Sequence, residues 1–225
     1  MWGGQSYLVK DGDAGKTITL TVTGTRTGYL TYEKTVSVAV PAAAAAAASK
    51  APVITGTPQV GKQLTVTPAT WDLNGTSTFS WLAGGDVVGT GSSYVLKPAD
   101  AGLNIRVRET RTVSGHEPGT ATSAATSPVD PATVSLTVDA PKKVKRNKRP
   151  TVTVTVSSPG LVPPGSIQVT YGGQALESQA LTGGQVTFRL PKQSTTGKKK
   201  LVLTYLPSVT GYTTNSTTVK ITITR

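Results

Sequence analysis

The sequence predicts an all-β protein made of tandem β-sandwiches of the Greek-key type, the first of them incomplete. Thr, Val, Gly and Pro dominate the composition. Thr and Val favour pleated strands, whereas Gly and Pro favour turns. Apolar and polar residues alternate with a period of two in many short segments, which is typical of half-buried strands, and no segment has a convincing helical period.

Residues 1–40 are predicted to be the C-terminal half of a repeat, because they match a later part of the chain at a constant offset of 87 residues. Residues 4–10 match residues 91–97, and residues 13–15 (Asp-Ala-Gly) match residues 100–102. A fixed period indicates a repeat array. The front half of this copy is missing from the sequence. Because so short a segment buries little surface, we expect weak order unless it packs on a neighbour.

Residues 41–51 form an Ala-rich run between prolines, which we interpret as an interdomain linker. An Ala run this short is marginal as a helix in water. A second junction, residues 127–131, contains two prolines that stiffen a short connection.

Residues 52–130 are predicted to be a complete repeat, with strands at 62–67, 78–82, 93–97 and 104–108 separated by turn signals. Residues 133–225 alternate more cleanly and form a basic domain of about seven strands, the spacing of a Greek-key sandwich. Its strands are expected at 134–138, 152–156, 167–171, 175–176, 186–190, 201–205 and 219–223.

Particular residues carry a resemblance to a known family. They are Pro52–Gly56, Val60–Val66, Trp71, Trp81, Tyr94 and Asp100–Gly102. Together they resemble the immunoglobulin-like (Ig-like) repeats of large bacterial surface and secreted proteins. Residues 133–225 are similar to a related repeat, through Lys142–Arg149, the TVTVTV run 151–156, and Tyr205 followed by Gly211-Tyr212. The resemblance implies tandem Ig-like sandwiches with a structural or adhesive role, and it identifies no ligand.

The composition narrows the possible chemistry. The 225 residues include no Cys and one His, which excludes disulfides, a Cys nucleophile, thiolate metal sites and a His-rich zinc site. We expect no catalytic residue, no metal and no cofactor. His116 lies in a turn where the first copy has Tyr29, so we interpret it as a packing or solvent-facing residue, with catalysis as the less favoured alternative.

Asp13 and Asp100 are predicted to cap turns by accepting backbone hydrogen bonds; the alternative, a calcium loop at residues 11–13, lacks enough carboxylates. Trp81 is predicted to be buried in the core, as in Ig sandwiches, with a sugar-stacking surface as the alternative. Trp71 is ambiguous, and Trp2 is predicted to be exposed.

The net charge of +12 is concentrated in residues 133–225, which hold 13 Lys and Arg against 2 acidic residues. If the 142–149 loop and the 197–200 turn lie at one end of the sandwich, they form a patch attractive to polyanions. The candidate contacts are Lys142, Lys143, Lys145, Arg146, Lys148, Arg149, Lys198, Lys199 and Lys200. The alternative is that these are solvated charges that prevent sheet edges from associating. The basic run has no interleaved aromatics, so no specific nucleic-acid partner is expected.

Two expectations for function follow. The first is a non-catalytic structural spacer or adhesion-type module of a bacterial cell-surface or secreted protein. The alternative is a polyanion- or carbohydrate-binding accessory module that uses residues 133–225, with an anionic cell-wall polymer or glycan as partner. The N-terminus lacks a signal-peptide pattern and no apolar run approaches the roughly 20 residues that span a bilayer. We therefore interpret the chain as a fragment of a longer extracellular protein, next to other domains of the same polypeptide, without membrane insertion.

Overall fold

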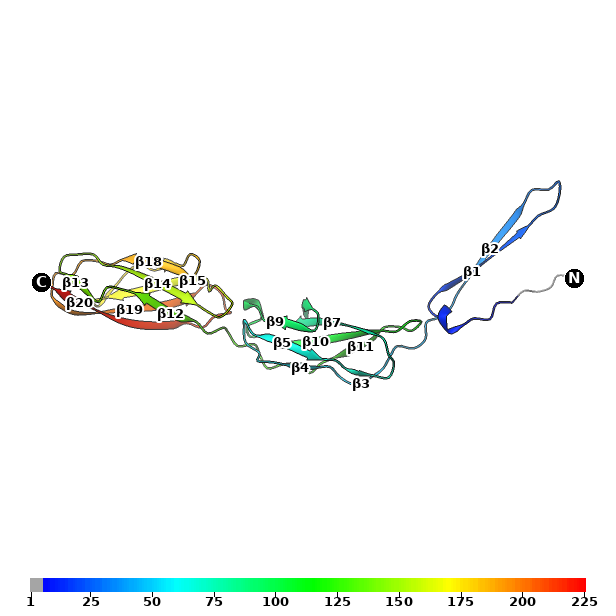
Figure 1. Cartoon of the computed structure of the whole chain (residues 1–225), viewed down its shortest axis with the longest axis horizontal. Coiled ribbons are helices and arrows are strands. Elements are labelled where there is room, and N and C mark those ends of the chain that lie inside the picture. Colours follow the sequence, from blue (N-terminus) through cyan, green and yellow to red (C-terminus); the bar gives the residue numbers. More distant parts are fainter. Residues whose placement is uncertain (1–5) are drawn as a thin grey trace. The chain divides into compact units, whose positions relative to one another are not determined.

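The computed structural model describes residues 6–225, and for residue 11 it describes the backbone alone (Figure 1). The described residues form strands joined by turns, with two single-turn 3-10 helices, η1 (Asp11–Asp13) and η2 (Pro98–Asp100). Among them no helix is long and apolar enough to cross a membrane. The all-β prediction is confirmed. The chain divides into two compact units, one made of residues up to 55, 65–93 and 106–125, and the other of residues 56–64, 94–105 and 126–225.

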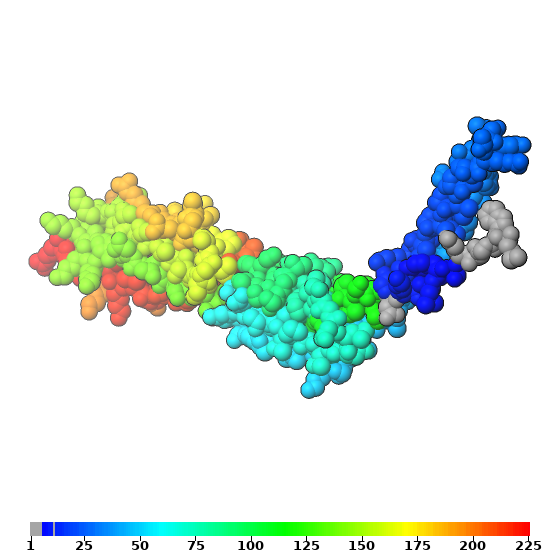
Figure 2. All heavy atoms as spheres, turned by 45° about the vertical axis from the view of Figure 1, so that its right-hand side comes forward, coloured from blue at the N-terminus to red at the C-terminus, as the bar shows by residue number. Residues whose placement is uncertain are grey.

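The first described element is an antiparallel hairpin of β1 (Thr17–Gly24) and β2 (Tyr32–Ala39). Its odd-numbered hydroxyl residues share one face and form hydrogen bonds across the hairpin, at 3.1 Å between Thr19 and Ser37. The even-numbered apolar residues therefore share the opposite face. Figure 2 shows that the hairpin (blue) remains narrow when all its atoms are drawn.

The complete repeat reproduces this hairpin. Its strands β10 (Ile105–Thr112) and β11 (Gly119–Thr122) pair Arg108 with Thr122, which is the pair Thr21–Thr35 of β1 and β2 displaced by 87 residues. The short helices η1 and η2 are displaced by the same number. The repeat seen in the sequence is therefore present in the backbone, including the strand register.

The complete repeat has the strand order of an Ig-like sandwich. One sheet has the order β4 (Val53–Thr55), β5 (Gln63–Thr67), β9 (Ser93–Val95). The other has the order β11, β10, β7 (Thr76–Ala83), β8 (Asp86–Thr90). Each hairpin stays within one sheet, and the chain crosses between the sheets from β5 to β7, from β8 to β9 and from β9 to β10, which is a Greek-key arrangement, as the sequence predicts.

The core of this repeat consists of the inward positions of its strands. The fully buried side chains include Leu64, Trp81, Leu96, Ile105 and Val107. The Trp81 indole N–H donates a hydrogen bond to the Gly91 carbonyl at 2.9 Å. The predicted burial of Trp81 is confirmed, and a fully buried ring offers no surface for stacking a sugar.

Part of the Ala-rich segment 41–51 packs on the complete repeat. Residues Ala48–Lys50 form β3, which pairs with β6 (Thr70–Trp71), and Ala46 is buried. The Ala47 N–H donates to the Asp72 carboxylate at 2.8 Å. Small side chains allow the backbone to approach closely here. The segment boundaries expected from the sequence remain predictions.

Residues 133–225 form a second sandwich. Its smaller sheet has the order β12 (Ser135–Asp139), β14 (Thr151–Ser157), β18 (Gln185–Arg189). Its larger sheet has the order β13 (Lys143–Lys145), β20 (Asn215–Thr224), β19 (Gly197–Pro207), β15 (Gly165–Tyr171), β16 (Gln174–Ala175), and β17 (Gln179–Ala180) also pairs with β15. The expected apolar positions are buried, among them Val152, Val154, Ile167, Val169, Leu201, Leu203 and Ile221.

Candidate functional site

The sheet of residues 133–225 brings the two predicted basic segments together on neighbouring strands. Strand β13 pairs in parallel with β20, and β19 pairs with the same part of β20 from the other side. Thr222 is consequently the register partner of both Lys143 and Lys198. The condition set by the sequence, that the two basic segments lie at one end of the sandwich, is met.

The side chains of five lysines point away from the core of this sandwich. Ile221 and Ile223 of β20 are buried, so Thr222 and its register partners point to the opposite face. The same alternation assigns Lys145, Lys200 and Lys220 to this outer face. All five lysines are exposed, and we call them the lysine face: Lys143, Lys145, Lys198, Lys200 and Lys220.

The lysine face concentrates positive potential. Neighbouring strands are about 4.8 Å apart and alternate residues along a strand about 6.7 Å apart. Both spacings are below the Debye length of about 8 Å at physiological ionic strength, so the fields of the five ammonium groups add. Lys200 and Lys220 are directly opposite each other in the antiparallel pair of β19 and β20. Like charges in that position destabilise a sheet.

The other predicted basic residues surround this face. Lys142, Arg146, Lys148 and Arg149 are exposed in the segments that flank β13. The Arg146 N–H donates to the Thr224 carbonyl at 2.9 Å, which fixes the start of the loop beside the end of β20. Lys199 differs from the rest, because it has the inward register of Ile221, is half-buried, and donates from Nζ to the Thr195 hydroxyl at 2.7 Å.

A polar hollow of about 570 Å³ adjoins the end of β20. It is lined by Arg146, Arg225 and the hydroxyl residues Ser194, Thr195 and Thr196. Guanidinium and hydroxyl groups are donors suited to sulfate, phosphate or carboxylate oxygens. The hollow thus extends the cationic surface beyond the lysine face.

Sequence reasoning missed Lys220 and Arg225. Each is an isolated cation in a strand pattern, without the clustering that marks 142–149 and 198–200. Only the register of β19 against β20 places Lys220 opposite Lys200. The outward position of Lys220 in the alternation of β20 was the available signal.

The two turn-capping predictions are confirmed. One carboxylate oxygen of Asp100 accepts hydrogen bonds from the Tyr94 hydroxyl at 2.8 Å and the Lys97 N–H at 2.7 Å. Asp13 accepts from Tyr7 and Lys10, both at 2.9 Å, and the N–H of Lys10 and the hydroxyl of Tyr7 hold the pKa of Asp13 below its usual value.

His116 is half-buried in its turn, where its Nδ1 lies 3.1 Å from the Ser114 carbonyl. Among residues 6–225 no group of three or more His, Cys, Asp or Glu side chains is arranged to hold a metal ion. Trp2 and the side chain of Asp11 lie outside what the structure describes.

The role of Trp71, which the sequence leaves ambiguous, is explained by a buried carboxylate. Glu109 is fully buried on β10 and accepts hydrogen bonds from the Trp71 indole at 2.8 Å, the Ser77 hydroxyl at 2.6 Å and the Ala69 N–H at 2.7 Å. Three donors to one carboxylate compensate for the loss of hydration. The Glu109 carboxylate thus links β6 and β7 to β10 through hydrogen bonds, and Trp71 has a structural role.

Comparison with known proteins gives likenesses of fold. No family model and no curated protein matches the sequence. The chain is similar to the fibronectin(III)-like modules of Clostridium thermocellum CbhA, with 10% identity over 76% of this chain and 93% of that chain, and a TM-score of 0.33. It is similar to a two-domain fibronectin type III segment of chicken tenascin, with 12% identity over 76% and 98% of the two chains, and a TM-score of 0.39. It is also similar to a Ca²⁺-stabilized adhesin with which an Antarctic bacterium binds ice, with 14% identity over 92% and 56%, and a TM-score of 0.35.

Proposed function

We propose that this chain is a non-catalytic structural spacer or adhesion-type module of a bacterial exported protein, located outside the cell or on its surface. The observation that carries the proposal is the shortness of the joint between residues 52–130 and residues 133–225. A spacer transmits position and load only when its joints are short and their conformations few.

The joint is reduced to a single residue by hydrogen bonds on both of its sides. The Asp130 N–H donates to the Pro58 carbonyl at 2.8 Å, within the complete repeat. The Ala132 N–H donates to the Gly211 carbonyl at 2.9 Å, within the following sandwich. Between these anchored residues lies Pro131, whose ring fixes the backbone angle φ.

Pulsed electron spin resonance tests the spacer. Because the chain has no Cys, Thr120→Cys and Gln168→Cys introduce two unique labelling sites on exposed strand positions. We expect a narrow distance distribution between the labels. A matched variant with four Gly or Ser residues inserted after Pro131 should broaden it. An unmodified chain with a distribution as broad as that of the insertion variant would refute the proposal.

A second candidate function, contact with an anionic cell-wall polymer or glycan, is favoured by where the lysines lie. Strand β13 is a sheet edge, so Lys143 and Lys145 are in positions where lysines prevent edge association. Strands β19 and β20 pair only with each other at Lys198, Lys200 and Lys220, because the β15 ladder begins at Leu201 and the β13 ladder at Thr222. Protection of a free edge needs no pair of like charges, so it does not explain why Lys200 lies directly opposite Lys220, and an anionic partner would relieve their repulsion.

Heparin, used as a model sulfated polysaccharide, tests this second function. The variant Lys198→Gln, Lys200→Gln, Lys220→Gln should bind at least about tenfold more weakly than the parent and show a shallower dependence of affinity on salt. The control Lys34→Gln, Lys50→Gln, Lys62→Gln removes the same charge from exposed sites elsewhere. Equal losses in both variants would mean that net charge alone, and no particular surface, is responsible.

A further inference from the structure

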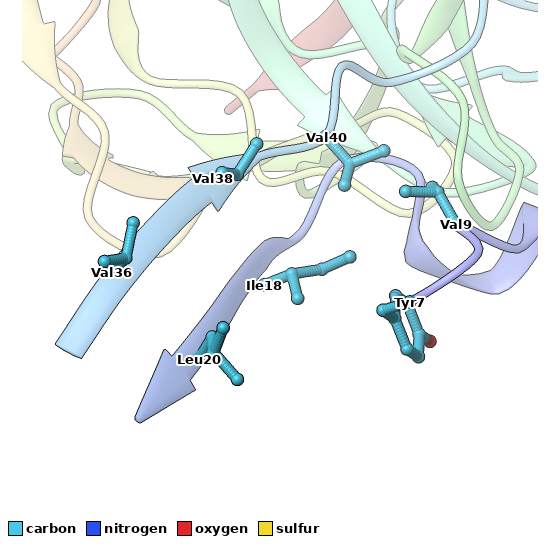
Figure 3. Close-up of a pocket in the computed structure, with 7 residues that line it drawn as sticks. All are labelled: Tyr7, Val9, Ile18, Leu20, Val36, Val38 and Val40. Atoms are coloured by element: carbon cyan, nitrogen blue, oxygen red, sulfur yellow. The ribbon is translucent and has the colours of Figure 1, made fainter. Parts of the chain in front are cut away.

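The face of the N-terminal hairpin is apolar and uncovered. Figure 3 shows Tyr7, Val9, Ile18, Leu20, Val36, Val38 and Val40 gathered around one hollow, whose volume is about 260 Å³. Tyr7, Leu20 and Val38 are 58%, 60% and 63% exposed. An apolar face of this kind normally marks a surface that another element covers.

The complete repeat shows what its own copy of this face meets. The equivalents of Tyr7, Val9 and Leu20, displaced by 87 residues, are Tyr94, Leu96 and Val107, and they are 7%, 1% and 0% exposed. The Tyr–Asp hydrogen bond and the hairpin register are the same in both copies. The two copies thus have the same strand register and the same Tyr–Asp hydrogen bond, but only in the complete repeat is the apolar face covered.

The elements that the hairpin lacks lie within residues 52–90. In the complete repeat β10 pairs with β11 on one edge and with β7 on the other, whereas in the described part of the chain β1 pairs with β2 alone. Strand β7 carries the fully buried Trp81, and β5 carries the fully buried Leu64. A segment of this type would supply both a strand for the free edge of β1 and side chains for the apolar face.

We propose that the apolar face of residues 6–40 binds a polypeptide segment with the sequence pattern of residues 52–90, the front half of an Ig-like repeat, and that binding completes a sandwich. The occupant adds a strand to an open edge, so main-chain hydrogen bonds provide affinity and the indole at the Trp81 position provides specificity. A second copy of the hairpin is a poorer occupant, because it lacks counterparts of Leu64 and Trp81 and would add a second Lys34 to the covered face.

One position of the occupant differs from that of residues 52–90. In the complete repeat Glu109 accepts a hydrogen bond from Ser77 of β7. Its equivalent in the hairpin, 87 residues earlier, is Val22. An occupant matched to the hairpin should therefore be apolar at the Ser77 position.

The test adds a second copy of residues 52–92 directly ahead of Ser6 in the otherwise full chain, with Ser77→Val in the added copy. Hydrogen exchange of the amides in residues 17–40 is measured, and β14 and β19 serve as internal references. We expect exchange to slow by about 100-fold or more, because the amides enter a cooperative unit. The control carries Trp81→Asp in the added copy and should leave exchange at the level of the parent.

A second pair of variants tests the face itself. Leu20→Asp should abolish the protection given by the added copy, whereas Thr19→Asp, on the opposite face, should preserve most of it. Unchanged exchange in residues 17–40 of the fused chain would overturn the proposal. A second result would also overturn it: protection of residues 17–40 in the parent chain that increases with protein concentration. The occupant would then be a second copy of the chain.

Discussion

Lys200 and Lys220 lie directly opposite each other across β19 and β20, with both side chains on the exposed face of the sheet. The arrangement lowers stability and raises local positive potential at the same time. The two effects can be separated by substitution, which makes this pair the most informative place to test the lysine face.

Replacing Lys220 by Thr removes the repulsion and introduces a residue that favours strands. We expect the free energy of unfolding, measured with urea, to rise by about 0.2–1 kcal/mol. Binding to heparin should weaken in the same variant. A variant that loses stability, or one that binds heparin as the parent does, would contradict the assignment of Lys220 to the anion-binding surface.

Replacing Trp81 by Ala should lower the free energy of unfolding by about 3–5 kcal/mol, because a large cavity forms in the core and an indole hydrogen bond is lost. Circular dichroism during urea unfolding measures the change. Trp71→Phe is the matched comparison, since it keeps the apolar ring and removes one donor to Glu109, with an expected loss of about 1–3 kcal/mol. A loss below about 1 kcal/mol for Trp81→Ala would place this ring outside the core.

Two buried tyrosines of residues 133–225 should respond oppositely to removal of the hydroxyl. The Tyr205 hydroxyl donates to the Pro164 carbonyl at 2.8 Å, whereas the buried Tyr171 hydroxyl has no hydrogen-bond partner among the described residues. Tyr171→Phe should therefore leave stability unchanged or raise it by about 1 kcal/mol, and Tyr205→Phe should lower it by about 1 kcal/mol. Urea unfolding of both variants checks the difference, and equal effects would refute it.

Stability should fall at alkaline pH. Burial raises the pKa of Tyr205 to about 12, with a smaller contribution from the nearby Tyr212, and burial also raises the pKa of Tyr94, Tyr171 and Tyr212. Above pH of about 10 the unfolded chain loses phenol protons that the folded chain retains. The stabilisation is complete below this pH; for Tyr205 it declines as pH rises toward about 12, by up to roughly 1.4 kcal/mol per pH unit, and the other buried tyrosines act in the same direction.

Urea unfolding at several alkaline pH values measures this slope, and Tyr205→Phe should make it shallower. A stability that stays constant above pH of about 10 would show that these phenols ionise equally in the folded and unfolded chains.

Much of the fold followed from local pattern, because a period of two determines both strand and face. The inward positions of residues 152–156 and 201–205 are legible in the sequence for this reason. The 87-residue repeat was equally legible, and it extended to the hydrogen bond between Tyr7 and Asp13.

Other features depend on pairing between distant segments, which local pattern does not encode. The strand at Ala48–Lys50 has no alternation of its own and exists because β6 and Asp72 offer it partners. Glu109 follows Ile105 and Val107 at an inward position, but its three donors come from residues 69–77. The basic clusters were visible in the sequence, whereas the outward register of Lys220 beside them required the sheet.

Each of the two linking segments places an alanine against the Gly-His or Gly-Tyr turn of the sandwich that follows it, Ala43 against His116 and Ala132 against Tyr212. A pulling force that travels along the backbone would meet two hydrogen bonds at Ala132 before it reaches β12. Rupture of these two hydrogen bonds would lengthen the chain slightly while the core strands stay paired. The joint would then extend reversibly under force, and the hydrogen bonds would re-form when the force drops.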